Sequence, residues 1–168
     1  ASAYQAVEIA QDIPPFVIGE RANANGSKAF RELLLADDYE GCLKVGVSQE
    51  GEGAHAADLC TAYAGRDELA DLTKLARLFA ESVRAPLVVD STTPDCIEAC
   101  LKLYPGRCLI NSINLEDGGA NLERVCRLAK KYGAAVVALT INEKGMAMTT
   151  DEKVETAKAI HALADAIR

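Results

Sequence analysis

The fold is decided by residues 86–112, whose sequence reads PLVVDSTTPDCIEACLKLYPGRCLINS. The stretch opens with an uninterrupted apolar run that stops at Asp90, and it closes with a second apolar run that stops at Asn111. Continuous apolar strands are typical of a parallel sheet, because helices cover such a sheet. Between the two runs, Thr93-Pro94 gives a helix cap followed by proline, and Gly106 follows the helix end. Residues 86–112 therefore predict one strand–helix–strand unit.

The same alternation continues along the chain. Apolar residues recur at helical spacing in the segments between the predicted strands. Thr149 and Glu152 have the spacing of a capping box before the last helix, and Gly133 follows the end of the helix before it. Five strands are predicted, at residues 16–20, 54–60, 86–90, 108–112 and 134–140.

Strands that alternate with helices indicate a parallel α/β domain. Two architectures remain open at this point: an open doubly wound sheet and part of an eight-stranded barrel. Periodicity does not separate them, although the 168 residues fit a five-unit open sheet better, because a full barrel needs at least about 200 residues. Residues 1–15 predict an extended linker, and residues 16–168 the domain.

Composition excludes several classes of function. The formal net charge is −7 and no cluster of Lys and Arg stands out, which argues against nucleic acid or an anionic membrane as partner. No apolar run approaches the roughly 20 residues that span a bilayer. The six cysteines fall on predicted helices and strands, as small buried hydrophobes do, so we expect no metal site and a cytoplasmic location.

Polar side chains stand where the predicted strands end. They are Glu20, Asp58, Asp90, Asn111 and the stretch 140–142. In both candidate architectures the carboxyl ends of the strands carry the active site, so we expect a shared small-molecule site there. His55 and His161 are expected to be structural.

This set of residues favours a neutral ligand rich in hydrogen-bond donors, or alternatively a divalent cation. It has no Lys or Arg for a phosphate, and neither common phosphate-binding glycine motif is present. A buried carboxylate pairs with two parallel N–H donors, which the N3–H and 2-amino group of a pterin present. Asparagine both donates and accepts, so it suits the neighbouring ring atoms.

At these same positions the chain resembles the pterin-binding domain of cobalamin-dependent methionine synthases. Residues 18–27, IGERANANGS, resemble the opening "IGERTN…GS" of that family. Residues 89–92, VDST, resemble its third-strand "IDS", and residues 111–113, NSI, its fourth-strand "NSI". Residues 132–145, YGAAVVALTINEKG, resemble its "YGAAVV…DEQG". The matches follow in order from about Pro15 to the end of the chain.

The resemblance implies a (β/α)8 TIM-barrel, of which this chain holds the first five βα units. It implies that 5-methyltetrahydrofolate binds as substrate and that its N5 methyl passes to cobalamin on another domain, and then to homocysteine on a further one. Asp90 and Asn111 would bind the pterin ring, with Asn23, Asp58 and Glu20 beside them. Asn111 would also be catalytic near N5. The family's second strand usually has Asn where this chain has Cys60.

Two other functions compete with this interpretation. One is a corrinoid protein methyltransferase of the same superfamily, with dihydropteroate synthase as a more distant relative. The other is a non-catalytic five-strand module that binds a ligand or a partner domain.

Overall fold

The computed structural model describes residues 1–167; Arg168, the last residue of the predicted domain, lies outside them. Its sheet has the strand order β1-β2-β3-β4-β5-β6. The first five strands run parallel, and β6 turns back antiparallel on β5, pairing Met146 with Ile141. The strands are β1 (Ile18–Asn23), β2 (Ala56–Cys60), β3 (Leu87–Asp90), β4 (Leu109–Leu115), β5 (Ala135–Asn142) and β6 (Gly145–Met146).

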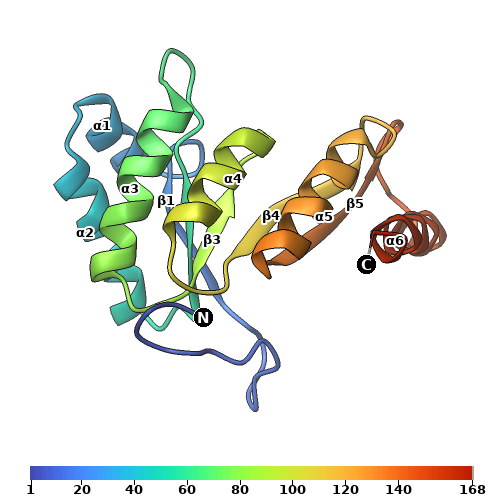
Figure 1. Cartoon of the computed structure of the whole chain (residues 1–168), viewed down its shortest axis with the longest axis horizontal. Helices are drawn as coiled ribbons and strands as arrows, with labels where there is room; N and C mark the ends of the chain where they lie inside the picture. Colours follow the sequence, from blue (N-terminus) through green and yellow to red (C-terminus); the bar gives the residue numbers. More distant parts are fainter. Residues whose placement is uncertain (168) are drawn as a thin grey trace.

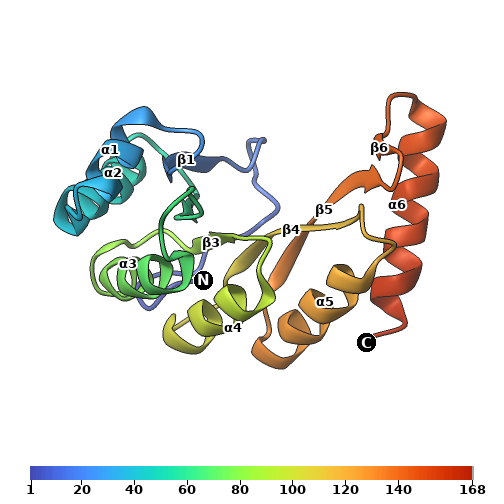
Figure 2. The ribbon, with the colours of Figure 1, turned by 90° about the horizontal axis from the view of Figure 1, so that it is seen from above.

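The unbroken strand order decides between the two architectures. A doubly wound sheet reverses its strand order at a switch point, whereas a barrel adds each strand beside the previous one. Figure 2 shows the strands along an arc, with helices on its outer side. The sheet is a curved partial barrel, as the family resemblance implied, and the five-strand doubly wound alternative is wrong.

Six helices accompany the sheet in residues 1–167, and α3, α4 and α5 lie along the outside of the arc (Figure 2). The last helix, α6, stands beyond β5 at the end of the sheet (Figure 1). The helices are α1 (Lys28–Leu35), α2 (Tyr39–Gly51), α3 (Glu68–Ser82), α4 (Pro94–Leu103), α5 (Ala120–Tyr132) and α6 (Thr150–Asp165).

The core lies between the outer face of the sheet and the helices. Leu59, Val89 and Ile110 from β2, β3 and β4 pack there with apolar residues of the helices. Side chains alternate across a strand, so the residues next to these, Asp58, Asp90 and Asn111, project from the concave face. The alternation of side chains along the strands therefore places apolar residues in the core and polar residues on the concave face.

Several local expectations are confirmed, and two boundaries differ. Thr149 and Glu152 form the capping box of α6, and Gly133 ends α5 in the left-handed conformation. Gly106, however, is not a helix cap, because α4 ends at Leu103 and its C-cap residue, Tyr104, has extended backbone. Gly106 has a φ of +147° and lies against the backbone of Ala1. A Cβ at this position would lie 2.3 Å from the Ala1 carbonyl oxygen.

The first strand also begins and ends later than predicted. It runs to Asn23 instead of Glu20, because the backbone stays extended through a register shift between Gly19 and Ala22. Polar residues after an apolar run suggested an early end, but the irregular pairing lets two exposed polar residues remain inside the strand.

Residues 1–15 contain no helix or strand and cross the end of the domain opposite the strand carboxyl ends (Figure 1). The Ala1 amino group donates to the Arg107 carbonyl at 2.9 Å, and the Ser2 hydroxyl to the Arg84 carbonyl at 2.6 Å. The Tyr4 hydroxyl donates to the carbonyl of Glu81 at the end of α3. Among residues 1–167, no helix combines the length and apolar character needed to cross a membrane.

Candidate functional site

The polar strand ends of the first four strands meet on the concave face of the sheet. Asn23 of β1 lies beside Cys60 of β2, and Asp90 of β3 lies beside Asn111 of β4. Neighbouring residues in register point the same way, so these side chains form one row. Asp58, two residues before Cys60, projects from the same face one layer deeper.

Asn23 joins the two carboxylates of the site. Its Oδ1 accepts hydrogen bonds from the backbone N–H groups of Asn25 and Gly26, both at 2.9 Å, which fixes the direction of the amide. Its Nδ2 donates to Asp58 Oδ2 at 3.2 Å and to Asp90 Oδ2 at 2.9 Å. Loop N–H groups thus hold the amide so that its donors face the carboxylates.

Asp58 is fully buried beneath the row, at 0% exposure. Asn111 Nδ2 approaches its Oδ1 at 3.5 Å. Burial raises the pKa of Asp58 to about 7, helped by the charge of Asp90 and opposed by the hydrogen bonds from Asn23 and Asn111. Near neutral pH a substantial fraction of this carboxyl therefore carries a proton, whereas an exposed aspartate is ionised.

Asp90, by contrast, is half-buried. Burial raises its pKa, while hydrogen bonds from Cys60 and Asn23 act in the opposite direction. Burial raises the pKa of the Cys60 thiol to about 12, so the thiol keeps its proton and serves Asp90 as a weak donor. Asn25 Nδ2 in turn lies 3.7 Å from Cys60 Sγ.

Not every predicted residue joins this cluster. Glu20 is exposed on β1, and its charge reaches the site only as a contribution that raises the pKa of Asp58 and of Asp90. At the end of β5, Asn142 donates to Thr156 of α6 at 3.3 Å, so this amide ties the strand to the helix.

Both histidines make structural contacts. The Nδ1 of His55 accepts from the Val17 backbone N–H at 2.9 Å, and its ring stacks on Phe16. His161 pairs with Asp165 on α6 at 3.3 Å. All six cysteines are buried free thiols.

Two contributors escaped the sequence analysis. Asn25 reaches Cys60 and the Ala62 carbonyl from the loop after β1. Cys60 stands in the row itself, although only its departure from the family pattern was noted. The two asparagines Asn23 and Asn25 could have indicated the contribution of this loop, because Asn side chains often hydrogen-bond to the backbone of their own turn.

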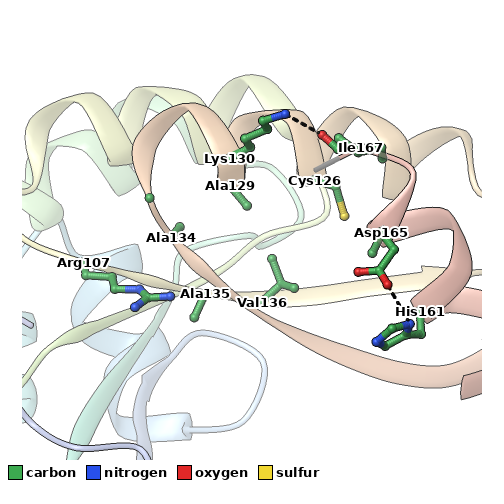
Figure 3. Close-up of a pocket in the computed structure, with 12 residues that line it drawn as sticks. Arg107, Cys126, Ala129, Lys130, Ala134, Ala135, Val136, His161, Asp165 and Ile167 are labelled. Carbon is green, nitrogen blue, oxygen red and sulfur yellow. Dashed lines mark hydrogen bonds and ion pairs between the residues drawn. The ribbon is translucent and has the colours of Figure 1, made fainter.

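A groove away from the concave face is shown in Figure 3. It has a volume of about 520 Å³ and runs between α5, α6 and the first residues of β5. Lys130 of α5 donates to the Ile167 carbonyl at 2.9 Å across it. Its lining holds none of the strand-end residues, so it is separate from the concave face. Within residues 1–167, no group of three or more His, Cys, Asp or Glu side chains is arranged to hold a metal ion.

A sheet that curves as part of a barrel, with carboxylates and amides at its strand ends, has the arrangement of the barrel enzymes, which carry their active sites at that end of the strands. The chain matches the model of the pterin binding enzyme family over residues 19–168 and belongs to that family.

Two curated relatives within this family confirm the resemblance that the motifs show. The chain is 47% identical over 163 residues to methionine synthase of Mycobacterium tuberculosis, and 45% identical to that of Mycobacterium leprae. These alignments cover 95% of this chain and 14% of each relative.

Solved structures of similar shape confirm the fold. One is dihydropteroate synthase of Xanthomonas albilineans with 4-aminobenzoic acid, at a TM-score of 0.61 and 19% identity. Another is dihydropteroate synthase of Thermus thermophilus, at a TM-score of 0.59 and 24% identity. These alignments cover 89% and 90% of this chain, and 55% and 53% of those chains, as expected for a partial barrel.

Proposed function

We propose that this chain binds 5-methyltetrahydrofolate and presents its N5 methyl for transfer in the synthesis of methionine from homocysteine. The observation that carries the proposal is the row of Asn23, Asp90 and Asn111 above the buried Asp58. Membership of the pterin-binding family and the identity to methionine synthases support it.

The row offers complementary groups to a pterin. Asp90 is the half-buried carboxylate, so it is the one that a ligand reaches, and its two oxygens suit the N3–H and 2-amino group. Asn23 already donates to Asp90 and holds it in place. Asn111, the neighbour of Asp90 in the sheet, would then lie along the ring toward N5.

The reaction requires N5 to leave as an amine, so the site must favour a protonated or polarised N5 as the carbon–nitrogen bond breaks. A neutral amide such as Asn111 hydrogen-bonds near N5 without taking its proton. The methyl acceptor would be cobalamin bound on another domain, which supplies the nucleophile. We propose that this domain and a homocysteine-binding domain belong to the same polypeptide, and that residues 1–15 act as a linker in the cytoplasmic protein.

Calorimetric titration of 5-methyltetrahydrofolate tests the proposal. It is performed on the chain and on a polypeptide extended to eight βα units. Asp90→Ala and Asn111→Ala should each weaken binding by about 1.5–3 kcal/mol, because each removes a hydrogen-bonding partner in a partly desolvated site. Asp12→Ala, at an exposed aspartate outside the sheet, serves as the control and should bind normally. Absence of folate binding in the extended polypeptide would refute the function, and equal binding by all variants would refute the site.

A further inference from the structure

A half-buried carboxylate, Glu68, bridges the loops that follow β2 and β3. Glu68 is the first residue of α3. Its Oε1 accepts a hydrogen bond from the Ser91 hydroxyl, and its Oε2 accepts one from the Thr93 hydroxyl at 3.2 Å. Its backbone carbonyl accepts from the hydroxyl of Thr61, a fully buried residue directly after Cys60, at 3.3 Å.

These contacts surround the residue that follows Asp90. Ser91 is 3% exposed, and its hydroxyl accepts from the Thr93 backbone N–H at 3.1 Å while it donates to Glu68. The Ser91 N–H donates to the Asn111 carbonyl at 3.2 Å. The backbone that leaves Asp90 is therefore tied to Glu68 on one side and to Asn111 on the other.

The Thr93 side chain takes part in this bridge instead of capping its own helix. It occupies the N-cap position of α4, where a threonine hydroxyl ordinarily accepts from a backbone N–H of the first turn. In this chain its side chain makes no such cap bond and donates to Glu68 instead. A capping interaction worth about 1 kcal/mol is given up for a contact with another helix.

The location is electrostatically costly, which argues against a chance contact. Asp90 accepts hydrogen bonds from Cys60 and Asn23, and three carboxylates lie close enough to act on its charge: Glu20, Asp58 and Glu68. A further carboxylate beside Asp58 and Asp90 is unfavourable unless donors offset it. Two hydroxyl donors do so, and the N-terminus of α3 favours negative charge.

We propose that Glu68 is a positioning residue for pterin binding: through Ser91 and Thr93 it fixes the end of β3, so that the Asp90 carboxylate is held ready for the ring. This inference rests on the proposed function. Glu68 does not contact the ligand in this scheme, and its effect is transmitted through the backbone on either side of Ser91.

The test compares Glu68→Ala with Glu68→Gln in the polypeptide used for the folate titration. Glu68→Ala should weaken 5-methyltetrahydrofolate binding about tenfold, because both hydroxyls lose their charged acceptor. Glu68→Gln should bind within about twofold of the parent, since the amide accepts from Ser91 and donates to Thr93. Glu81→Ala, at an exposed glutamate near the other end of α3, is the matched control and should bind as the parent does.

A second readout does not depend on the ligand. The carboxyl carbon of Asp90, followed by NMR through a pH titration, should show a lower pKa in Glu68→Gln, because a negative neighbour has been removed while the bridge persists. This titration reports whether the Glu68 charge acts on Asp90, and an unchanged titration would contradict the short path between the two carboxylates on which the inference depends. If Glu68→Ala fails to fold, Thr93→Val removes one donor at an exposed position and should weaken binding about threefold.

The outcomes separate the two proposals. If the parent does not bind folate, the proposed function is wrong, and the Asp90 titration still shows whether Glu68 acts on that carboxylate. If the parent binds and Asp90→Ala does not, but a folded Glu68→Ala binds as the parent does, the positioning role is wrong and the function stands. Equal weakening in Glu68→Ala and Glu68→Gln also overturns the inference, because the charge alone would then explain it.

Discussion

At the scale of single residues, Asp58 is the group whose environment departs furthest from that of a free aspartate. It is buried at 0% exposure, and burial, followed by the charge of Asp90, raises its pKa to about 7. The unfolded chain releases this proton near pH 3.9. Between these two values the folded protein holds a proton that the unfolded chain has lost, so the contribution of Asp58 to stability falls as pH rises and is gone above about pH 7.

This linkage can be measured by replacing Asp58 with asparagine. Relative to the parent, Asp58→Asn should gain about 2 kcal/mol in free energy of unfolding between about pH 5 and pH 7.5, because the variant has no carboxyl to deprotonate. Urea unfolding at a series of pH values gives the comparison, and the titration of all other groups cancels in the difference. Parallel stability curves for the two proteins would show that Asp58 has an ordinary pKa.

The sequence predicted which residues meet in the candidate site better than it predicted how they interact. Polar residues at the ends of apolar runs indicated Asp58, Asp90 and Asn111, because the period of a strand decides which face a side chain occupies. The orientation of Asn23 depends on two loop N–H groups, and the contact between Cys60 and Asp90 depends on the register between strands. Neither follows from a local pattern, since both are set by tertiary structure.

At the scale of elements, the contact between α2 and α3 depends on a glycine. Gly46 of α2 is buried against the ring of Phe79 of α3, and a Cβ at this position would lie 2.3 Å from Phe79 Cζ. Glycine is unfavourable inside a helix, so its presence here is explained by the close approach of the two helices.

A matched pair of substitutions in this helix has opposite expected effects. Gly46→Ala should destabilise the protein by about 1–3 kcal/mol, because the added methyl overpacks the contact with Phe79. Gly51→Ala, at the end of the same helix with nothing within 4 Å of the added carbon, should stabilise it by about 0.5 kcal/mol. Thermal unfolding of both variants measures the two changes in stability. A stabilising Gly46→Ala would mean that α2 and α3 are further apart than described.

Element types were predicted more securely than element ends. All five parallel strands were expected near their observed positions, because long apolar runs and helical repeats are strong signals. The ends shifted where pairing is irregular, as in β1, and the short strand β6 was missed. A two-residue strand carries no periodicity of its own, so only its pairing with Ile141 and Asn142 reveals it.

At the scale of the whole molecule, burial is uneven along the sheet. Every residue of β2 is buried, whereas β5 has two exposed residues and α6 buries only Thr156 and Ile160. Local opening follows buried contacts, so the two ends of the arc should differ in stability.

Hydrogen exchange provides the test of this gradient. Backbone amides of β2 and β3 should exchange most slowly, and those of α6 fastest among the helices, because fewer buried side chains hold α6 on the sheet. Mass spectrometry of peptides that cover each element gives the order. Uniform protection from β2 to α6 would show that the chain opens only as one cooperative unit.

The short strand β6 has a consequence for how this sheet meets other chains. An unpaired strand edge is a template for association between molecules. Because Gly145 and Met146 fold back over Asn142 and Ile141, the template that β5 offers ends before those residues. Any strand that joins the sheet there, from this polypeptide or from another copy, must pair with the earlier part of β5. The turn at Glu143 and Lys144 thereby limits the registers in which the sheet can extend.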